Sequence, residues 1–277
     1  MNMRRLVPLI LKYAVLTGAL IALLGPIWML FVSSFRQTAG ILSYPPVLWP
    51  GDGNLNNFKQ VFTMQNHVFG RWFLNSLIVS GGNTVIVLIL SSMAGFAFAK
   101  RTFPLKNTLF AIVIATQMIP AVATLIPLFL LISGFSMNNQ YSGLILPGAA
   151  SAFGVFLMTQ FMRDIPDAII EAAEIDGANP YSIFIRIIAP ITVPTMSLLA
   201  IFNFTQQWGS LTWPLIIVSR GAMRTLPLGI ASMKDLSGSV SGPIMAATLL
   251  SFIPVLIAFL CAREKFIAGM TLGAVKG

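Results

Sequence analysis

Five carboxylates lie close together in a chain that is otherwise very apolar. The chain has eight acidic residues, and five of them fall within residues 164–177: Asp164, Asp167, Glu171, Glu174 and Asp176. This polar segment interrupts a series of long hydrophobic runs, in which charged groups are costly. The pattern predicts that the segment contacts another molecule.

A second group of polar side chains is uncharged and lies inside the hydrophobic runs: Asn75, Asn83, Gln117, Asn203, Gln206 and Gln207. Such side chains form hydrogen bonds between neighbouring membrane helices, which is the simplest interpretation of each one. They also suit a path for a neutral, hydroxyl-rich solute. No Asp, Glu, Lys, Arg or His lies near the centre of any run, although ion-coupled carriers usually keep such groups within the membrane. The runs therefore do not favour an ion-driven pump.

Catalytic and cofactor chemistry has little support in the sequence. The single cysteine, Cys261, and the single histidine, His67, exclude an internal disulfide and a metal site built from several Cys or His ligands. No Gly-Lys pair occurs, so the phosphate-binding loop of many ATPases is absent. We expect no catalytic residue, no metal and no bound cofactor on this chain. Energy for uphill transport would have to come from another subunit.

Membrane-length helices must position these groups. Hydrophobic residues make up 56% of the chain and charged residues 9%, against roughly a quarter charged in soluble domains, and the mean hydropathy is +0.85. A spanning helix needs about 20 apolar residues. Six runs meet this need: residues 14–32, 73–99, 108–132, 143–161, 188–208 and 243–262. Prolines predict kinks in the third run, at Pro120 and Pro127, and in the fifth, at Pro190 and Pro194. The sequence predicts an all-α membrane protein, one bundle of six transmembrane helices over residues 1–277.

The basic residues orient the predicted bundle. If the N-terminus is cytoplasmic, eleven of the 17 Lys and Arg residues lie on the cytoplasmic side, as the positive-inside rule expects. Both termini and the acidic segment are then cytoplasmic. Since this topology accounts for the net charge of +9, nucleic acid is not an expected partner.

Local signals predict two short helices in the acidic segment, residues 164–186. Gly177 is a typical helix stop, and Asn179-Pro180 is a typical start of the next helix. The first helix carries an acidic stripe beside an apolar one: Asp167, Glu171 and Glu174 beside Ile165, Ile169, Ala172 and Ala173. A solvated acidic face is the alternative, but such a face would not require the small apolar flank or the glycine hinge.

Residues 171–194 resemble the EAA motif of ABC importer permeases. The matching positions stand at that family's spacing: Glu171-Ala-Ala, Asp176-Gly-Ala, Phe184, Ile187, Pro190 and Pro194. Two other segments are similar to the carbohydrate-type, maltose-permease-like inner-membrane subunits: Pro26-Ile-Trp with Ser33-Ser-Phe-Arg36, and the tail from Gly269 to Gly277.

The resemblance implies a type I ABC importer permease fold in the inner (cytoplasmic) membrane of a prokaryote. The implied partners are a second permease, two ATPase subunits that hold ATP and Mg²⁺, an extracytoplasmic solute-binding protein and membrane lipid. The acidic segment would be the coupling helix that docks in an ATPase cleft, through Glu171, Ala172, Ala173, Asp176 and Gly177. The C-terminal tail, residues 263–277, would reach the ATPase interface through Gly273, Val275, Lys276 and Gly277.

Solute contacts are expected near the outer end of the fifth run, where amides and aromatic faces suit a sugar: Asn203, Gln206, Gln207, Trp208 and Trp213. We therefore expect a transport subunit, not an enzyme, that imports a carbohydrate or related polyol together with a second permease. A permease for glycerol phosphate or glycerophosphodiesters is one alternative, with Arg220 and Arg224 as anion contacts. A membrane scaffold that transports nothing is another.

Overall fold

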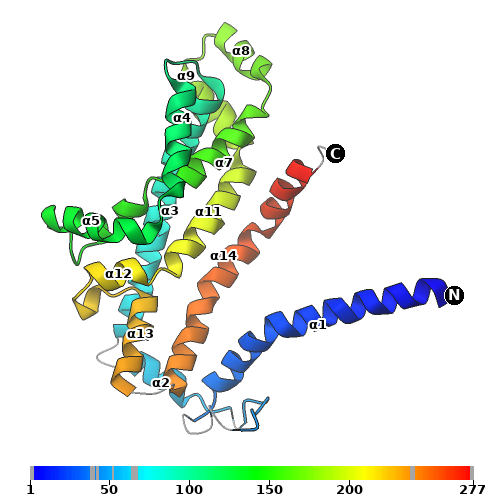
Figure 1. The fold of residues 1–277 in the computed structure, drawn as a ribbon, viewed down its shortest axis with the longest axis vertical. Helices are drawn as coiled ribbons and strands as arrows, with labels where there is room; N and C mark the ends of the chain where they lie inside the picture. Colours follow the sequence, from blue (N-terminus) through cyan, green and yellow to red (C-terminus); the bar gives the residue numbers. More distant parts are fainter. Residues whose placement is uncertain are drawn as a thin grey trace. The chain divides into compact units, whose positions relative to one another are not determined.

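The computed structural model describes the backbone of residues 3–37, 41, 44–51, 53–63, 68–237 and 241–274, and the side chains of these residues except 3–8, 10, 234–237 and 262–274. The described residues form helices and turns and contain no strand, as the all-α prediction expects (Figure 1). The chain divides into two compact units. One consists of residues 1–70 and 229–253, and the other of residues 71–228 and 254–277.

Three helices are continuous and long enough to cross a membrane. They are α1 (Met3–Ser34), α3 (Val68–Lys100) and α14 (Gly242–Ala274). Their apolar parts are Leu11–Ser34, Val68–Lys100 and Gly242–Cys261. These helices contain the predicted runs 14–32 and 73–99 in full and correspond to the predicted run 243–262.

The other three predicted runs are each two helical segments with a bend between them. In the third run, α4 (Lys106–Ala115) and η3 (Thr116–Met118) meet α5 (Ala121–Gly134) at 100°. In the fourth, α6 (Tyr141–Ile145) and η4 (Leu146–Gly148) meet α7 (Ala152–Arg163) at 46°. In the fifth, α9 (Pro180–Ile183), η5 (Phe184–Ile188) and α10 (Ala189–Ile191) meet α11 (Val193–Trp208) at 76°. If each bent pair is one span, the described part of the chain has up to six.

The sharpest bend has a local cause at Pro120. A proline disfavours the helical conformation in the residue before it, and Ile119 has an extended backbone with φ −78° and ψ 120°. Pro120 also has no N–H to continue the helical hydrogen bonds, so α5 starts anew at Ala121. Where the sequence predicts a kink in one helix, the structure shows a complete break.

In the first unit, the short helix α2 (Asn56–Thr63) is attached to the end of α1. The buried amide of Asn57 donates hydrogen bonds to the carbonyl oxygens of Ser34 at 2.8 Å and Arg36 at 2.7 Å. The last carbonyls of a helix, such as that of Ser34, accept no hydrogen bond within the helix, and Arg36 lies two residues beyond the end of α1. Gly242, the first residue of α14, lies close to the same amide. A Cβ on Gly242 would lie only 2.4 Å from Asn57 Oδ1, so the contact requires a glycine.

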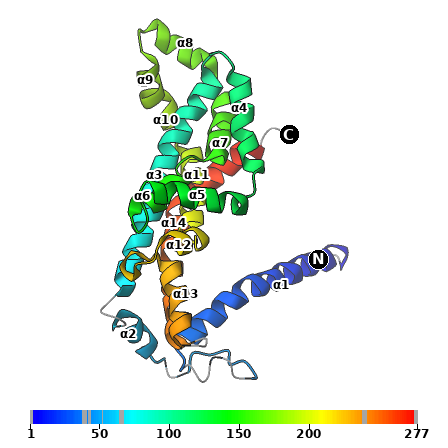
Figure 2. The same ribbon diagram turned by 60° about the vertical axis from the view of Figure 1, so that its left-hand side comes forward.

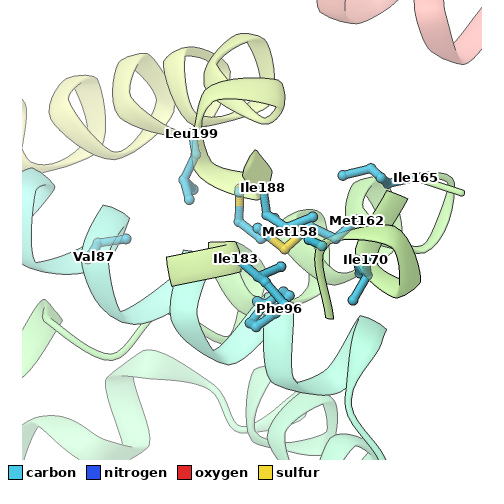
Figure 3. Packing of buried hydrophobic residues seen from close by; sticks show 10 residues of the cluster. Val87, Phe96, Met158, Met162, Ile165, Ile170, Ile183, Ile188 and Leu199 are labelled. Atoms are coloured by element: carbon cyan, nitrogen blue, oxygen red, sulfur yellow. The ribbon is translucent and has the colours of Figure 1, made fainter. Parts of the chain in front are cut away.

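In the second unit, α3 and α7 pack closely at two glycines. A Cβ on Gly95 would lie 2.6 Å from Met158 Cβ, and a Cβ on Gly154 would lie 2.3 Å from Ser91 Oγ. Next to this contact lies an apolar core cluster contributed by α3, α7, α8 (Asp167–Ile175), α9, η5 and α11 (Figure 3). Its buried members are Val87, Phe96, Met158, Met162, Ile165, Ile170, Ala173, Ile183, Ile188 and Leu199. We call it the inner core.

The N-terminal half of α3 contacts the segment between α12 (Thr212–Ile217) and α13 (Leu226–Ser237). This segment includes η6 (Gly221–Met223). The fully buried Asn75 side chain donates to the carbonyls of Ala222 at 2.8 Å and Arg224 at 2.9 Å, and accepts a bond from Tyr141 Oη at 2.7 Å. Asn75 therefore has the structural role that is the simplest expectation for an amide in a membrane helix.

Candidate functional site

The acidic segment forms two helices with a glycine turn between them, as predicted (Figure 2). Gly177 has φ +79°, a conformation that side chains disfavour. Its neighbour Ala178 donates to the carbonyl of Ala173 at 2.9 Å, which ends α8 with a typical C-terminal turn. Asn179 Oδ1 accepts a bond from the Ser182 N–H at 2.8 Å and caps α9.

One face of α8 packs on the inner core and the other is open. Ile170 and Ala173 are 6% and 9% exposed. Four of the five residues predicted to dock an ATPase are exposed: Glu171, Ala172, Asp176 and Gly177. Ala173 differs from the prediction, because its methyl group faces the protein's own core. Ala173 would affect docking only indirectly, because it holds α8 against the inner core.

The acidic stripe on α8 is only partly open to a partner. Lys100 Nζ lies 2.6 Å from Asp167 Oδ1, and Arg101 Nη1 lies 2.7 Å from Glu174 Oε1. The stripe was predicted as a contact surface for another molecule, but two of its three carboxylates are paired within the chain. Among the described residues, Glu171 alone of the three forms no ion pair.

A cavity of about 440 Å³ lies between α11 and the start of α7, within the usual range of about 300–1,000 Å³ for small-molecule sites. Its α11 wall is one helix face, since positions three and four apart are neighbours on a helix. Phe153 and Phe202 contribute rings whose centroids are 6.1 Å apart. The lining residues are Ser151, Phe153, Leu199, Phe202, Asn203, Gln206, Gln207 and Ser210.

Hydrogen bonds to α3 orient the amide of Asn203 in this wall. Asn203 Nδ2 donates to Asn83 Oδ1 at 2.8 Å and to Thr84 Oγ1 at 3.1 Å. Asn83 is fully buried and donates in turn to the carbonyl of Ile145 at 2.7 Å. Because the amide nitrogen of Asn203 is engaged by α3, a solute in the cavity would meet its carbonyl oxygen, which accepts hydrogen bonds from hydroxyl groups.

The structure brings together three of the five predicted solute contacts, Asn203, Gln206 and Gln207. Trp208 and Trp213 are not lining residues of this cavity. Trp208 is 4% exposed and packs edge-on against Phe73, while Trp213 Nε1 donates to the carbonyl of Gly143 at 3.0 Å. The indole of Trp208 is therefore packed against another ring, and the N–H of Trp213 is engaged in a hydrogen bond within the chain.

Sequence analysis missed the aromatic residues that line the cavity. Phe202 was within reach of a spacing argument, because it lies one helical turn from Gln206. Phe153 and Ser151 carried no such signal, since their position depends on the break between η4 and α7. Of the predicted tail contacts, Val275, Lys276 and Gly277 lie outside the described residues, and Gly273 lies in the last turn of α14.

Gly148 leaves the space that the cavity amides need, which leads to a test. A Cβ at this position would lie 2.4 Å from Gln207 Nε2 and 2.9 Å from Asn83 Nδ2. We expect Gly148→Ala to displace Gln207 and weaken solute uptake, with an increase in KM of about twofold to tenfold if one hydrogen bond is lost. The control is Gly134→Ala, where a Cβ meets nothing within 4 Å. Equal KM values for the two variants would contradict the role of Gly148.

Comparisons with known proteins agree with this architecture. Residues 87–267 match the family model described as "Binding-protein-dependent transport system inner membrane component". The chain belongs to this family.

The named relatives are permease proteins. The chain is 32% identical over 254 residues to the arabinooligosaccharides transport system permease protein AraQ of Halalkalibacterium halodurans, which covers 91% of each chain. It is 30% identical over 267 residues to the sn-glycerol-3-phosphate transport system permease protein UgpE of Salmonella typhi, covering 94% of this chain and 95% of the relative.

A solved structure shows the same fold. It is described as "a bacterial ABC transporter involved in the import of the acidic polysaccharide alginate". The match has a TM-score of 0.85 at 20% identity and covers 96% of this chain and 99% of the other.

Proposed function

We propose that this chain is a permease subunit of an ATP-driven importer and that it forms, with a second permease, the path for a neutral carbohydrate or related polyol. The observation that carries the solute class is the chemistry of the cavity. Its lining residues supply amides, hydroxyls and two aromatic rings and include no charged side chain. Amide side chains can both donate hydrogen bonds to hydroxyl groups and accept hydrogen bonds from them. Ring faces pack against the apolar faces of a sugar.

The relatives support this class and also keep an alternative open. AraQ is named for arabinooligosaccharides and UgpE for sn-glycerol-3-phosphate. A phosphate group would favour a cationic partner in the site, and the cavity offers none among its lining residues. Arg220 and Arg224, the predicted anion contacts, are not among them either. The cavity therefore favours the neutral solute over glycerol phosphate and over a scaffold that transports nothing.

The rest of the proposed assembly follows from family membership and from α8. Two ATPase subunits would bind ATP and Mg²⁺, and one of them would dock on the exposed face of α8 at Glu171, Ala172, Asp176 and Gly177. A solute-binding protein would deliver the solute from outside. Both termini would be cytoplasmic, which also places the C-terminal tail on the side of the ATPases.

Substitution of the cavity glutamines tests the solute assignment. We expect Gln206→Ala and Gln207→Ala to raise KM for a transported oligosaccharide by about twofold to tenfold each, the loss expected for one uncharged hydrogen bond. The measurement is uptake by the complete transporter in vesicles, with competition by arabinooligosaccharides and by glycerophosphodiesters. Gln60→Ala serves as a control, because Gln60 lies on α2 with an exposed side chain. Unchanged KM in both cavity variants, or stronger competition by the diesters, would contradict the proposal.

A further inference from the structure

Two adjacent cations at the end of α3, Lys100 and Arg101, hold α8 at two separate points. Lys100 pairs with Asp167 in the first turn of α8, and Arg101 pairs with Glu174 in its last turn. Asp167 and Glu174 are two turns apart, about 11 Å along the helix. A helix held at both ends cannot tilt or rotate without separating one pair. We call Lys100 and Arg101 together the α3 clamp.

Lys100 is the more buried of the two, with a side chain 4% exposed. Besides Asp167, its Nζ donates to the carbonyl oxygens of Ile165 and, at 3.4 Å, of Arg163. Arg163 is the last residue of α7, so Lys100 places a positive charge at the negative end of α7 while Asp167 places a negative one at the positive end of α8. One ammonium group thus joins three helices.

Arg101 depends on Glu174 for its charge balance. Its side chain is 28% exposed and its guanidinium lies over the ring of Phe96, 5.2 Å from the centroid. Among the described residues, its Nε and Nη2 are buried without a hydrogen-bond partner. Glu174 is therefore the anion that the guanidinium meets, and removal of Glu174 would leave a partly buried cation uncompensated.

The same helix that carries the clamp also holds the cavity wall. Asn83 and Thr84 of α3 bind Asn203, about 25 Å along the helix from Lys100. The α3 helix is continuous between these positions, and Phe96 and Val87 join the inner core together with Ile170 of α8. The clamp and the cavity contact are therefore parts of one rigid element.

We propose that Lys100 and Arg101 are positioning residues for coupling: they make α8 and α3 move together, so that a docked ATPase which displaces α8 also displaces the α3 residues that hold Asn203. This inference rests on the proposed docking of an ATPase at α8. It assigns the acidic residues of α8 two different roles. Asp167 and Glu174 attach the helix to its own subunit, and Glu171 faces the partner.

The first experiment measures the attachment without any solute. Spin labels are placed at Ala168→Cys on α8 and Ile89→Cys on α3, both exposed, in a Cys261→Ser background of the complete transporter. We expect one narrow distance distribution that is the same without nucleotide and with ATP plus vanadate. Arg101→Glu and Glu174→Arg should each broaden it, and the double variant with exchanged charges should restore it. Lys12→Glu, which makes the same charge change in α1, should have no effect.

The second experiment measures the consequence for transport. We expect each single variant to lower the amount of solute moved per ATP hydrolysed by about fivefold, the upper range for one surface ion pair, because this pair is only partly buried. The exchanged pair should restore it, while the ATPase still co-purifies. Glu174→Gln provides a milder variant if charge reversal prevents folding. An unchanged distance distribution in Arg101→Glu and Glu174→Gln, or no rescue by the exchange, overturns the clamp. Failure of the wild-type transporter to move any carbohydrate would count against the proposed function, while the distance measurement would still test the clamp.

Discussion

The variant Gly95→Leu is expected to prevent the second unit from folding. Gly95 lies where α3 crosses α7, and even a Cβ there would meet Met158 Cβ at 2.6 Å, the Met158 carbonyl carbon at 3.0 Å and the Thr159 nitrogen at 3.1 Å. Two of these atoms belong to the backbone and cannot move aside by a rotamer change. Extra methylenes in a packed core cost about 1–3 kcal/mol, and a leucine that must separate two helices should reach or exceed the upper value. The measurement is the yield and thermal stability of the detergent-purified protein.

Gly81→Leu is the matched control, because it makes the same substitution in the same helix. A Cβ on Gly81 meets nothing within 4 Å, and substitutions away from packed contacts usually change stability by about 0.5 kcal/mol or less. We expect Gly81→Leu to be purified with nearly normal yield. If Gly95→Leu were equally well folded, the close packing of α3 against α7 would not be needed for the fold.

The continuous helices were predictable because a single property defines them. An apolar run of membrane length with no strong interruption, as in α3, must form its backbone hydrogen bonds internally. The bent pairs were less predictable. Pro120 indicated an irregular point in the helix, but whether a proline kinks a helix or ends it depends on the contacts around it. In the fourth run, the break follows η4, which contains Pro147, and the next helix begins with a cap at Ser151.

The candidate site shows a similar division between local and long-range information. The glycine turn at Gly177 and the cap at Asn179 were predictable, because caps and turns are determined by residues close in the chain. The spacing of the acidic residues on α8 was also correct. The partners of Asp167 and Glu174 were not predictable, because Lys100 and Arg101 are distant in sequence and no periodicity connects them. A helical period identifies a shared face but does not determine what covers it.

The energy for solute accumulation is expected to come from another subunit, not from this chain. A tenfold accumulation of a neutral solute requires about 1.4 kcal/mol, and carriers driven by ions usually keep ionisable groups within the membrane to couple the two movements. The six predicted runs contain no Asp, Glu, Lys, Arg or His. Vesicles that contain this chain without ATPase subunits should therefore accumulate no carbohydrate, whether a proton gradient, a sodium gradient or no gradient is imposed.

The matched preparation contains this chain together with the second permease, both ATPases and the solute-binding protein. ATP is supplied on the cytoplasmic side of the permease. It should accumulate the solute at least about tenfold, a gradient of about 1.4 kcal/mol, and should stop when the ATPases are inactivated. Accumulation driven by an ion gradient in vesicles of the lone chain would show that this chain couples solute to ions by itself. It would contradict a division of labour in which this chain forms the path and a partner supplies the energy. Accumulation that requires ATP hydrolysis would instead connect the cavity beside α11 to the surface on which we propose that an ATPase docks, the exposed face of α8.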